Sequence, residues 1–188
     1  WAFKQLYEAG KIYEGEKVLM YDTKFATPVS KAEVTMDNDA YQTVTDPSVY
    51  VKFKLENRCD IDPYDENANL DVYLLAWTTT PWTLPANLML AVSPEMTYCE
   101  VLVGDEKLII AEEALERVLQ DDKHRPLDYE VLRRFSGSEL VGRAYQPLDT
   151  GSTYPEDAKV HHIYPADFVT TESGTGIVHI APAYGEDD

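Results

Sequence analysis

The chain has 188 residues, of which 16 are lysine or arginine and 34 are aspartate or glutamate, giving a formal net charge of −18. A protein this acidic repels a phosphate backbone, which argues against independent, tight binding of nucleic acid. The length favours a single domain, and no apolar run approaches the length needed to span a membrane.

The only two cysteines are Cys59 and Cys99. They form no Cys-x-x-Cys pair and no cluster with histidines, so neither a zinc site nor a disulfide framework is indicated. We therefore expect two free thiols in a reducing, cytoplasmic environment, with no metal site and no cofactor.

The first half of the chain predicts one helix and one hairpin. Residues 1–8 carry apolar side chains on one helical face. Residues 49–55 alternate between apolar and polar side chains, as in a half-buried strand. Residues 57–69 are rich in Asp, Asn and Pro and predict a loop that leads into a second strand at 70–79. These two strands are expected to form an antiparallel hairpin.

The second half predicts further short strands. A Gly-Asp turn joins strands at 98–103 and 107–110, and apolar residues at helical spacing predict a helix over 111–120. Residues 129–135 and 140–148 are expected to be strands, and 150–157 a loop. This pattern indicates a β-rich α/β fold, with a barrel-like core of short, mostly antiparallel strands and peripheral helices.

A threonine-rich segment follows the second predicted strand. Residues 77–87 read Trp-Thr-Thr-Thr-Pro-Trp-Thr-Leu-Pro-Ala-Asn. The strand delivers three hydroxyls to its end, and the two prolines, which lack a backbone N–H, stop the ladder and stiffen the loop that carries Thr83. Four hydroxyls and the Asn87 amide within ten residues are typical of a surface that hydrogen-bonds a small polar ligand.

A second segment of interest covers residues 167–188. Gly174 and Gly176 permit a close backbone approach, and 177–180 is strand-like, with His179 at the wall of a core or pocket. The chain then ends in the acidic residues Glu186, Asp187 and Asp188. Taken singly, the histidine also fits a plain core residue, the acidic triplet a solvated turn, and the threonines ordinary strand formers.

Together, the two segments resemble the signatures of the editing insertion in isoleucyl-tRNA synthetases, within the class I aminoacyl-tRNA synthetase family. Related valyl and leucyl enzymes carry Thr-Thr-Arg-Pro, and Thr80 stands where they have Arg. Residues 1–35 also resemble the segment that leads into the insertion. The resemblance implies that residues 1–188 are a single editing domain excised from a larger synthetase, with 1–15 forming a junction helix with the catalytic body.

The resemblance also implies roles for individual residues. Asp188, which would bind the substrate's α-ammonium group, forms the catalytic set with Thr80 and His179. Water is the expected nucleophile, because no Ser or Cys stands in a nucleophile setting. His179 and Thr83 would set the size of the side-chain pocket. The implied substrate-binding residues are Thr78, Thr79, Thr83, Asn87 and Asp188.

The implied function is proofreading. Isoleucyl-tRNA synthetase is itself the standard worked case of this problem, because a hydrophobic pocket distinguishes isoleucine from valine by only about 150-fold. We expect hydrolysis of valine misattached to isoleucine tRNA, and of valyl-adenylate as a second substrate. The expected partners are the tRNA 3′ end and the rest of the synthetase, with the fragment itself a monomer.

Two alternatives to the hydrolase remain open at this point. One is a non-catalytic module that only binds the tRNA acceptor end, and the other is an inert structural insertion. No His-Ile-Gly-His or Lys-Met-Ser-Lys motif is present in the sequence, so the chain itself is not expected to aminoacylate.

Overall fold

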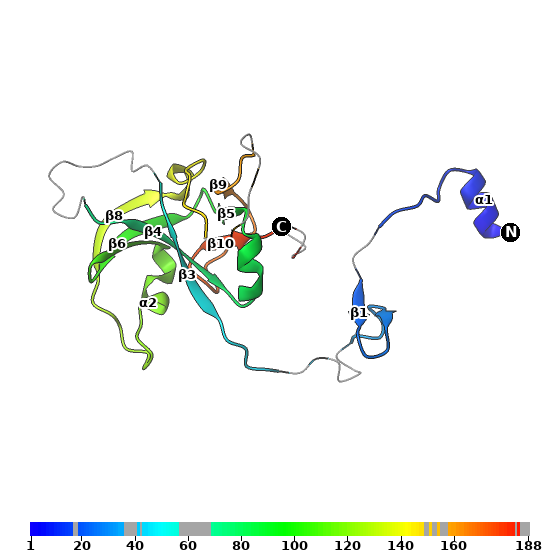
Figure 1. The fold of residues 1–188 in the computed structure, drawn as a ribbon, viewed down its shortest axis with the longest axis horizontal. Coiled ribbons are helices and arrows are strands. Elements are labelled where there is room, and N and C mark those ends of the chain that lie inside the picture. Colours follow the sequence, from blue (N-terminus) through cyan, green and yellow to red (C-terminus); the bar gives the residue numbers. More distant parts are fainter. Residues whose placement is uncertain are drawn as a thin grey trace. The chain divides into compact units, whose positions relative to one another are not determined.

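The computed structural model describes residues 1–16, 19–35, 41, 43–56, 69–148, 151, 154, 158–182 and 184. The chain divides into two compact units, Trp1–Thr45 and Asp46–Asp188. The first unit holds the helix α1 (Ala2–Glu8) and an antiparallel pair of strands, β1 (Met20–Asp22) and β2 (Thr27–Val29) (Figure 1). The predicted N-terminal helix is confirmed, and none of its residues is buried within the unit. Its role as a junction and the single-domain organisation stay predictions.

The second unit contains a five-stranded sheet with the order β3–β4–β7–β6–β8. Its strands are β3 (Val49–Lys54), β4 (Val72–Thr78), β6 (Thr97–Val103), β7 (Glu106–Ala111) and β8 (Glu130–Ser136). Both predicted hairpins are confirmed, because β3 pairs with β4 and β6 with β7 in antiparallel register. The two hairpins join through a parallel pairing of β4 with β7.

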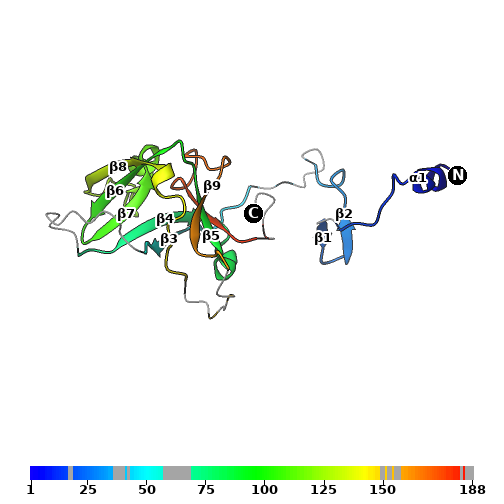
Figure 2. The same cartoon turned by 90° about the horizontal axis from the view of Figure 1, so that it is seen from above.

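A smaller sheet has the order β10–β5–β9, with β10 (Ile177–Ile180), β5 (Met89–Val92) and β9 (His162–Pro165). In Figure 2, β5 and β9 lie side by side at one end of the larger sheet. The strand β10 lies next to β4. One hydrophobic core spans both sheets, with Phe53 and Leu74 from the larger sheet and Leu90 and Ile163 from the smaller. This core holds the ends of β4 and β10 in place.

The β-rich α/β class with mostly antiparallel pairing is confirmed. The described strands of the second unit form two sheets rather than one continuous ring, so the closure of a barrel stays a prediction. No helix among the described residues is long and apolar enough to cross a membrane.

The predicted helix over 111–120 is shorter than expected. A 3₁₀ turn, η3 (Glu112–Ala114), leads into α2 (Leu115–Val118). Ala111 belongs to β7 and donates its N–H to the Thr175 carbonyl, and Leu119 leaves the helical region at ψ 69°. The expected apolar face is nevertheless buried, because Leu115 and Val118 pack into the core.

The predicted strand over 140–148 is wrong. Only isolated bridges form there, from Ala144 to His162 and from Tyr145 to Leu55. Gly142 lies in the left-handed region at φ 82°, and this turn interrupts the extended run. The strands β5 and β9 were not predicted, and the expected loops 57–69 and 150–157 lie mostly outside the described residues.

Candidate functional site

The threonine-rich segment folds into a strand end followed by a short helical turn. β4 ends at Thr78, and Pro81 opens the 3₁₀ helix η2 (Pro81–Ala86), where the missing N–H of proline costs nothing. The Thr80 N–H donates to the Thr78 hydroxyl at 3.1 Å. The Thr83 hydroxyl donates to the Thr80 carbonyl at 2.8 Å. Thr78 and Thr83 are buried, while Thr79 and Thr80 are exposed.

The two glycines of the second segment allow the close approach that their positions predict. A Cβ built on Gly176, which has φ +78°, would lie 2.4 Å from the Cβ of Ala111. The Tyr98 hydroxyl donates to the Gly176 carbonyl at 2.6 Å. Upstream, the Arg117 guanidinium donates to the carbonyls of Thr171 at 2.9 Å and of Gly174 at 2.8 Å. The segment that leads into β10 is therefore held by hydrogen bonds from Tyr98 and from Arg117.

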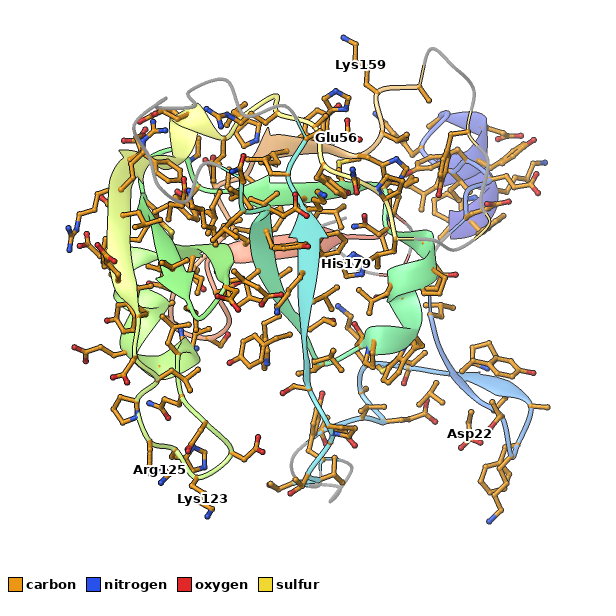
Figure 3. All side chains as sticks on the ribbon, turned by 60° about the vertical axis from the view of Figure 1, so that its left-hand side comes forward. Asp22, Glu56, Lys123, Arg125, Lys159 and His179 are labelled. Atoms are coloured by element: carbon orange, nitrogen blue, oxygen red, sulfur yellow. The ribbon has the colours of Figure 1, made fainter. Side chains whose placement is uncertain are left out.

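His179 connects the two segments. It lies on β10, next to the helical turn η2 (Figure 3). Its Nε2 is 2.9 Å from the Thr83 hydroxyl, and its Nδ1 is 2.9 Å from the Asn87 amide nitrogen. Segments almost a hundred positions apart in sequence are thus joined by two buried hydrogen bonds.

A cavity of about 250 Å³ opens between the two segments. The first segment contributes its threonines, and the second contributes residues of β10 and of the chain just beyond it. The cavity is lined by Trp77, Thr78, Thr79, Thr80, Thr83, Val178, His179, Ala181 and Tyr184. The threonine segment and β10 therefore face each other across this cavity.

The predicted site residues are therefore placed as follows. The four threonines and His179 line the cavity, while Asn87 lies behind His179 and hydrogen-bonds it. Asp188 lies outside the described residues, together with the rest of the acidic triplet. The catalytic and binding roles of all seven residues stay predictions.

The described lining of the cavity contains no Asp, Glu, Lys or Arg, and its hydrogen-bonding side chains are hydroxyls, the Trp77 indole and one imidazole. Two buried tyrosines support it from the core. Burial raises the pKa of Tyr98 to about 12, and burial likewise raises the pKa of Tyr145, against the opposing effect of its hydrogen bond to Asn87. Both tyrosines are therefore neutral hydrogen-bond donors at physiological pH.

Metal-binding side chains do not gather in the part of the chain that the structure describes, where no group of three or more His, Cys, Asp or Glu residues could hold an ion. Cys99 is a free, buried thiol, and burial raises its pKa. Cys59 lies outside the described residues.

A family model described as tRNA synthetases class I (I, L, M and V) matches residues 1–173. The chain belongs to this family. The resemblance drawn from the two segments is thereby confirmed, and it extends over the whole chain in the relatives that follow.

Curated relatives of this class I chain include isoleucine–tRNA ligases from three bacteria. Those of Mycobacterium tuberculosis (strain CDC 1551 / Oshkosh) and Mycobacterium leprae (strain TN) are 44% and 45% identical over 188 residues, which is all of this chain. That of Corynebacterium diphtheriae is 45% identical over 195 residues. The chain spans only 17% of the length of the two mycobacterial relatives and 18% of the corynebacterial one.

Solved structures with a similar fold are editing-type domains of leucyl enzymes. The crystal structure of GlLeuRS-CP1 has a TM-score of 0.55 at 21% identity, covering 72% of this chain and 55% of that one. The editing domain of the P. knowlesi cytosolic leucyl-tRNA synthetase has a TM-score of 0.52 at 18% identity, covering 71% and 58%. At these identities the likeness concerns the fold.

Several residues that line or support the cavity were not predicted from the sequence. Trp77 and Tyr184 lie inside the two segments, so their positions could have marked them as cavity residues. Val178 directly precedes His179. Tyr145 is different, because it belongs to neither segment. Its hydroxyl donates to the Asn87 side-chain oxygen at 2.6 Å, a contact that no local pattern predicts.

Proposed function

We propose that this chain is the editing domain of an isoleucyl-tRNA synthetase and that it hydrolyses the ester joining valine to isoleucine tRNA. The observation that carries this proposal is the cavity between the threonine segment and β10. At about 250 Å³ it lies just below the range of about 300–1,000 Å³ that accommodates drug-sized ligands. It therefore suits the aminoacyl end of a substrate, while the remainder of the tRNA stays outside.

We assign a binding role to each wall of the cavity. Exposed hydroxyls at Thr79 and Thr80, with Thr78 beside them, hold the aminoacyl group and the terminal adenosine. Thr83 and His179 are buried and hydrogen-bonded to each other, so they form a stiff wall that limits the amino-acid side chain. A wall that accepts valine and excludes the extra methylene of isoleucine supplies the second sieve.

The reaction needs no covalent enzyme intermediate. A water molecule attacks the ester carbonyl carbon, the bond from that carbon to the ribose oxygen breaks, and the ribose oxygen takes up a proton. The products are free valine and intact tRNA. The chain's contribution is to hold the ester and the water in line, because positioning of this kind accounts for a large part of rate enhancement. Valyl-adenylate is a second substrate of the same chemistry.

Asp188 is assigned to the α-ammonium group of the substrate. The described cavity lining contains no Asp, Glu, Lys or Arg, so a carboxylate from another part of the chain is needed to distinguish an aminoacyl group from a neutral acyl group. An ammonium–carboxylate hydrogen bond in a partly desolvated site contributes about 1.5–3 kcal/mol.

Docking of the tRNA depends on the remainder of the synthetase. A net charge of −18 repels the tRNA backbone, so we assign most of the tRNA contacts to parts of the protein beyond these residues. The exposed apolar residues of the first unit, among them Trp1, Phe3 and Tyr7, are assigned to the contact with that polypeptide.

The function is tested by the hydrolysis of valyl-tRNA in the full-length synthetase. Asp188→Ala is expected to lower the rate by about 10- to 150-fold, the equivalent of the lost charged hydrogen bond. Asp105→Ala is the matched control, because it removes the same charge from the exposed β6–β7 turn. An unchanged rate in Asp188→Ala refutes the ammonium role. A wild-type enzyme that binds valyl-tRNA without hydrolysing it supports the binding module instead.

A further inference from the structure

The amide of Asn87 lies at the centre of a buried hydrogen-bond network. Its nitrogen donates to the Met89 carbonyl at 3.0 Å and faces His179 Nδ1 at 2.9 Å. Its oxygen accepts the hydroxyl of Tyr145 at 2.6 Å. Asn87 is only 5% exposed, so these protein groups take the place of water around it.

The donors and acceptors of this network fix each other. A carbonyl oxygen can only accept, and the Tyr145 hydroxyl donates to the Asn87 oxygen. Met89 and Tyr145 together therefore orient the Asn87 nitrogen toward Met89 and His179. The nitrogen is a donor, and His179 Nδ1 must therefore accept and carry no proton. In a neutral imidazole the proton then sits on Nε2, where it is donated to the hydroxyl of Thr83.

The hydrogen bonds of Thr83 are consistent with a proton on His179 Nε2. The Thr83 hydroxyl donates its own proton to the Thr80 carbonyl at 2.8 Å, which leaves its oxygen free to accept from His179. Every donor from the core to the cavity thus meets an acceptor. The opposite tautomer would place two N–H groups against each other between Asn87 and His179.

Tyr145 is the anchor of this network in the core. Its residue is 1% exposed, and its ring packs edge-on against Phe53 at 5.3 Å between centroids. Its backbone N–H donates to His161, and a bridge joins it to Leu55. The tyrosine is therefore fixed on both sides, and its hydroxyl can hold the Asn87 oxygen in one place.

We propose that Tyr145 is a positioning residue of the site. Acting through Asn87, it holds His179 as a neutral imidazole whose proton sits on Nε2. His179 then presents the cavity with a fixed wall and a donor to Thr83, and it has no free nitrogen lone pair there to take a proton from water. The link to catalysis rests on the proposed function, whereas the tautomer is a property of the folded chain.

The test uses two-bond nitrogen–proton correlation spectra of His179 in the ¹⁵N-labelled chain. In the wild type, the proton is expected on Nε2, and the Tyr145 hydroxyl proton is expected to exchange slowly and to show a cross-peak to the Asn87 amide. A proton on Nδ1, or the absence of that cross-peak, overturns the proposal. Both readouts come from the unaltered chain and need no variant to fold.

Tyr145→Phe then removes only the hydroxyl and keeps the ring. The expected result is a mixture of His179 tautomers and a loss of about tenfold in kcat for valyl-tRNA hydrolysis by the full-length enzyme, with KM nearly unchanged. Tyr98→Phe is the matched control, since it deletes a buried hydroxyl that does not touch Asn87. It is expected to lower stability while leaving the tautomer intact.

The outcomes separate the two proposals. A single Nε2–H tautomer in Tyr145→Phe overturns the positioning role. An Nε2–H tautomer that Tyr145→Phe does disturb, in an enzyme that hydrolyses no valyl-tRNA, supports the positioning role and refutes the proposed function.

Discussion

Replacing Gly176 with alanine tests whether the close approach of the second segment holds the site together. The new Cβ would lie 2.4 Å from the Cβ of Ala111, and the residue would keep a φ of +78°. A left-handed conformation costs a non-glycine residue about 1–2 kcal/mol, and overpacking costs about 1–3 kcal/mol. The free energy of unfolding is therefore expected to fall by about 2–5 kcal/mol.

Gly104→Ala separates the two contributions. Gly104 has a φ of +60°, but a Cβ there meets nothing within 4 Å, so only the conformational cost of about 1–2 kcal/mol applies. Urea unfolding followed by circular dichroism measures both variants. With a slope of about 2 kcal/mol per molar, Gly176→Ala should lower the midpoint by about 1–2.5 M. Equal midpoints for the two variants would refute the packing argument.

His179→Ala enlarges the cavity, so the full-length enzyme should hydrolyse the valine ester with less selectivity over the isoleucine ester. The loss should reach at most the factor of about 10–200 that one methylene can supply. An unaltered ratio of the two hydrolysis rates would leave His179 as an ordinary core residue. Burial lowers the pKa of His161 below its usual 6.5, so the unfolded chain binds the proton more tightly, and stability should be full above about pH 6.5 and fall as the pH drops below it. His161→Asn, which tolerates the left-handed φ of 56°, should flatten that pH dependence of the urea midpoint, and a profile that keeps its slope would contradict the assignment. Arg117→Met removes the Nη2 group that donates to the carbonyls of Thr171 and Gly174, so amide hydrogen exchange at residues 171–174 should speed up by about tenfold. Unchanged exchange would show that these two hydrogen bonds do not hold the segment.

Local patterns were sufficient for the hairpins. The strict alternation in 49–55 places Phe53 in the core, and the turn around Gly104 joins β6 to β7 as its composition predicts. Both hairpins connect neighbours in sequence, so the signals for strand, turn and strand lie close together.

The pairing of strands that lie far apart in the sequence could not be predicted from local patterns. β5 and β9 pair in parallel although some seventy positions separate Met89 from its partner His162, and β9 ends on a proline, which weakens its strand signal. In the predicted strand 140–148, the left-handed φ of Gly142 interrupts the extended backbone. Tertiary context decided these segments.

The site residues also differ in whether a local sequence pattern marks them. The threonines and His179 were found because they lie in two compact segments whose composition is unusual. Tyr145 was missed because its importance comes from one contact with Asn87, 58 positions away in sequence. Its neighbours carry no pattern that marks it.

In the proposed function, one cavity between the threonine segment and β10 receives the aminoacyl ester. The most direct test is a crystal structure of the chain with a non-hydrolysable valyl-adenosine analogue. We predict the isopropyl group against Thr83 and His179, and the ester carbonyl beside Thr80 with an ordered water within about 3–3.5 Å of its carbon. An analogue bound elsewhere, or bound in the cavity with its ester remote from any water, would refute the proposed function.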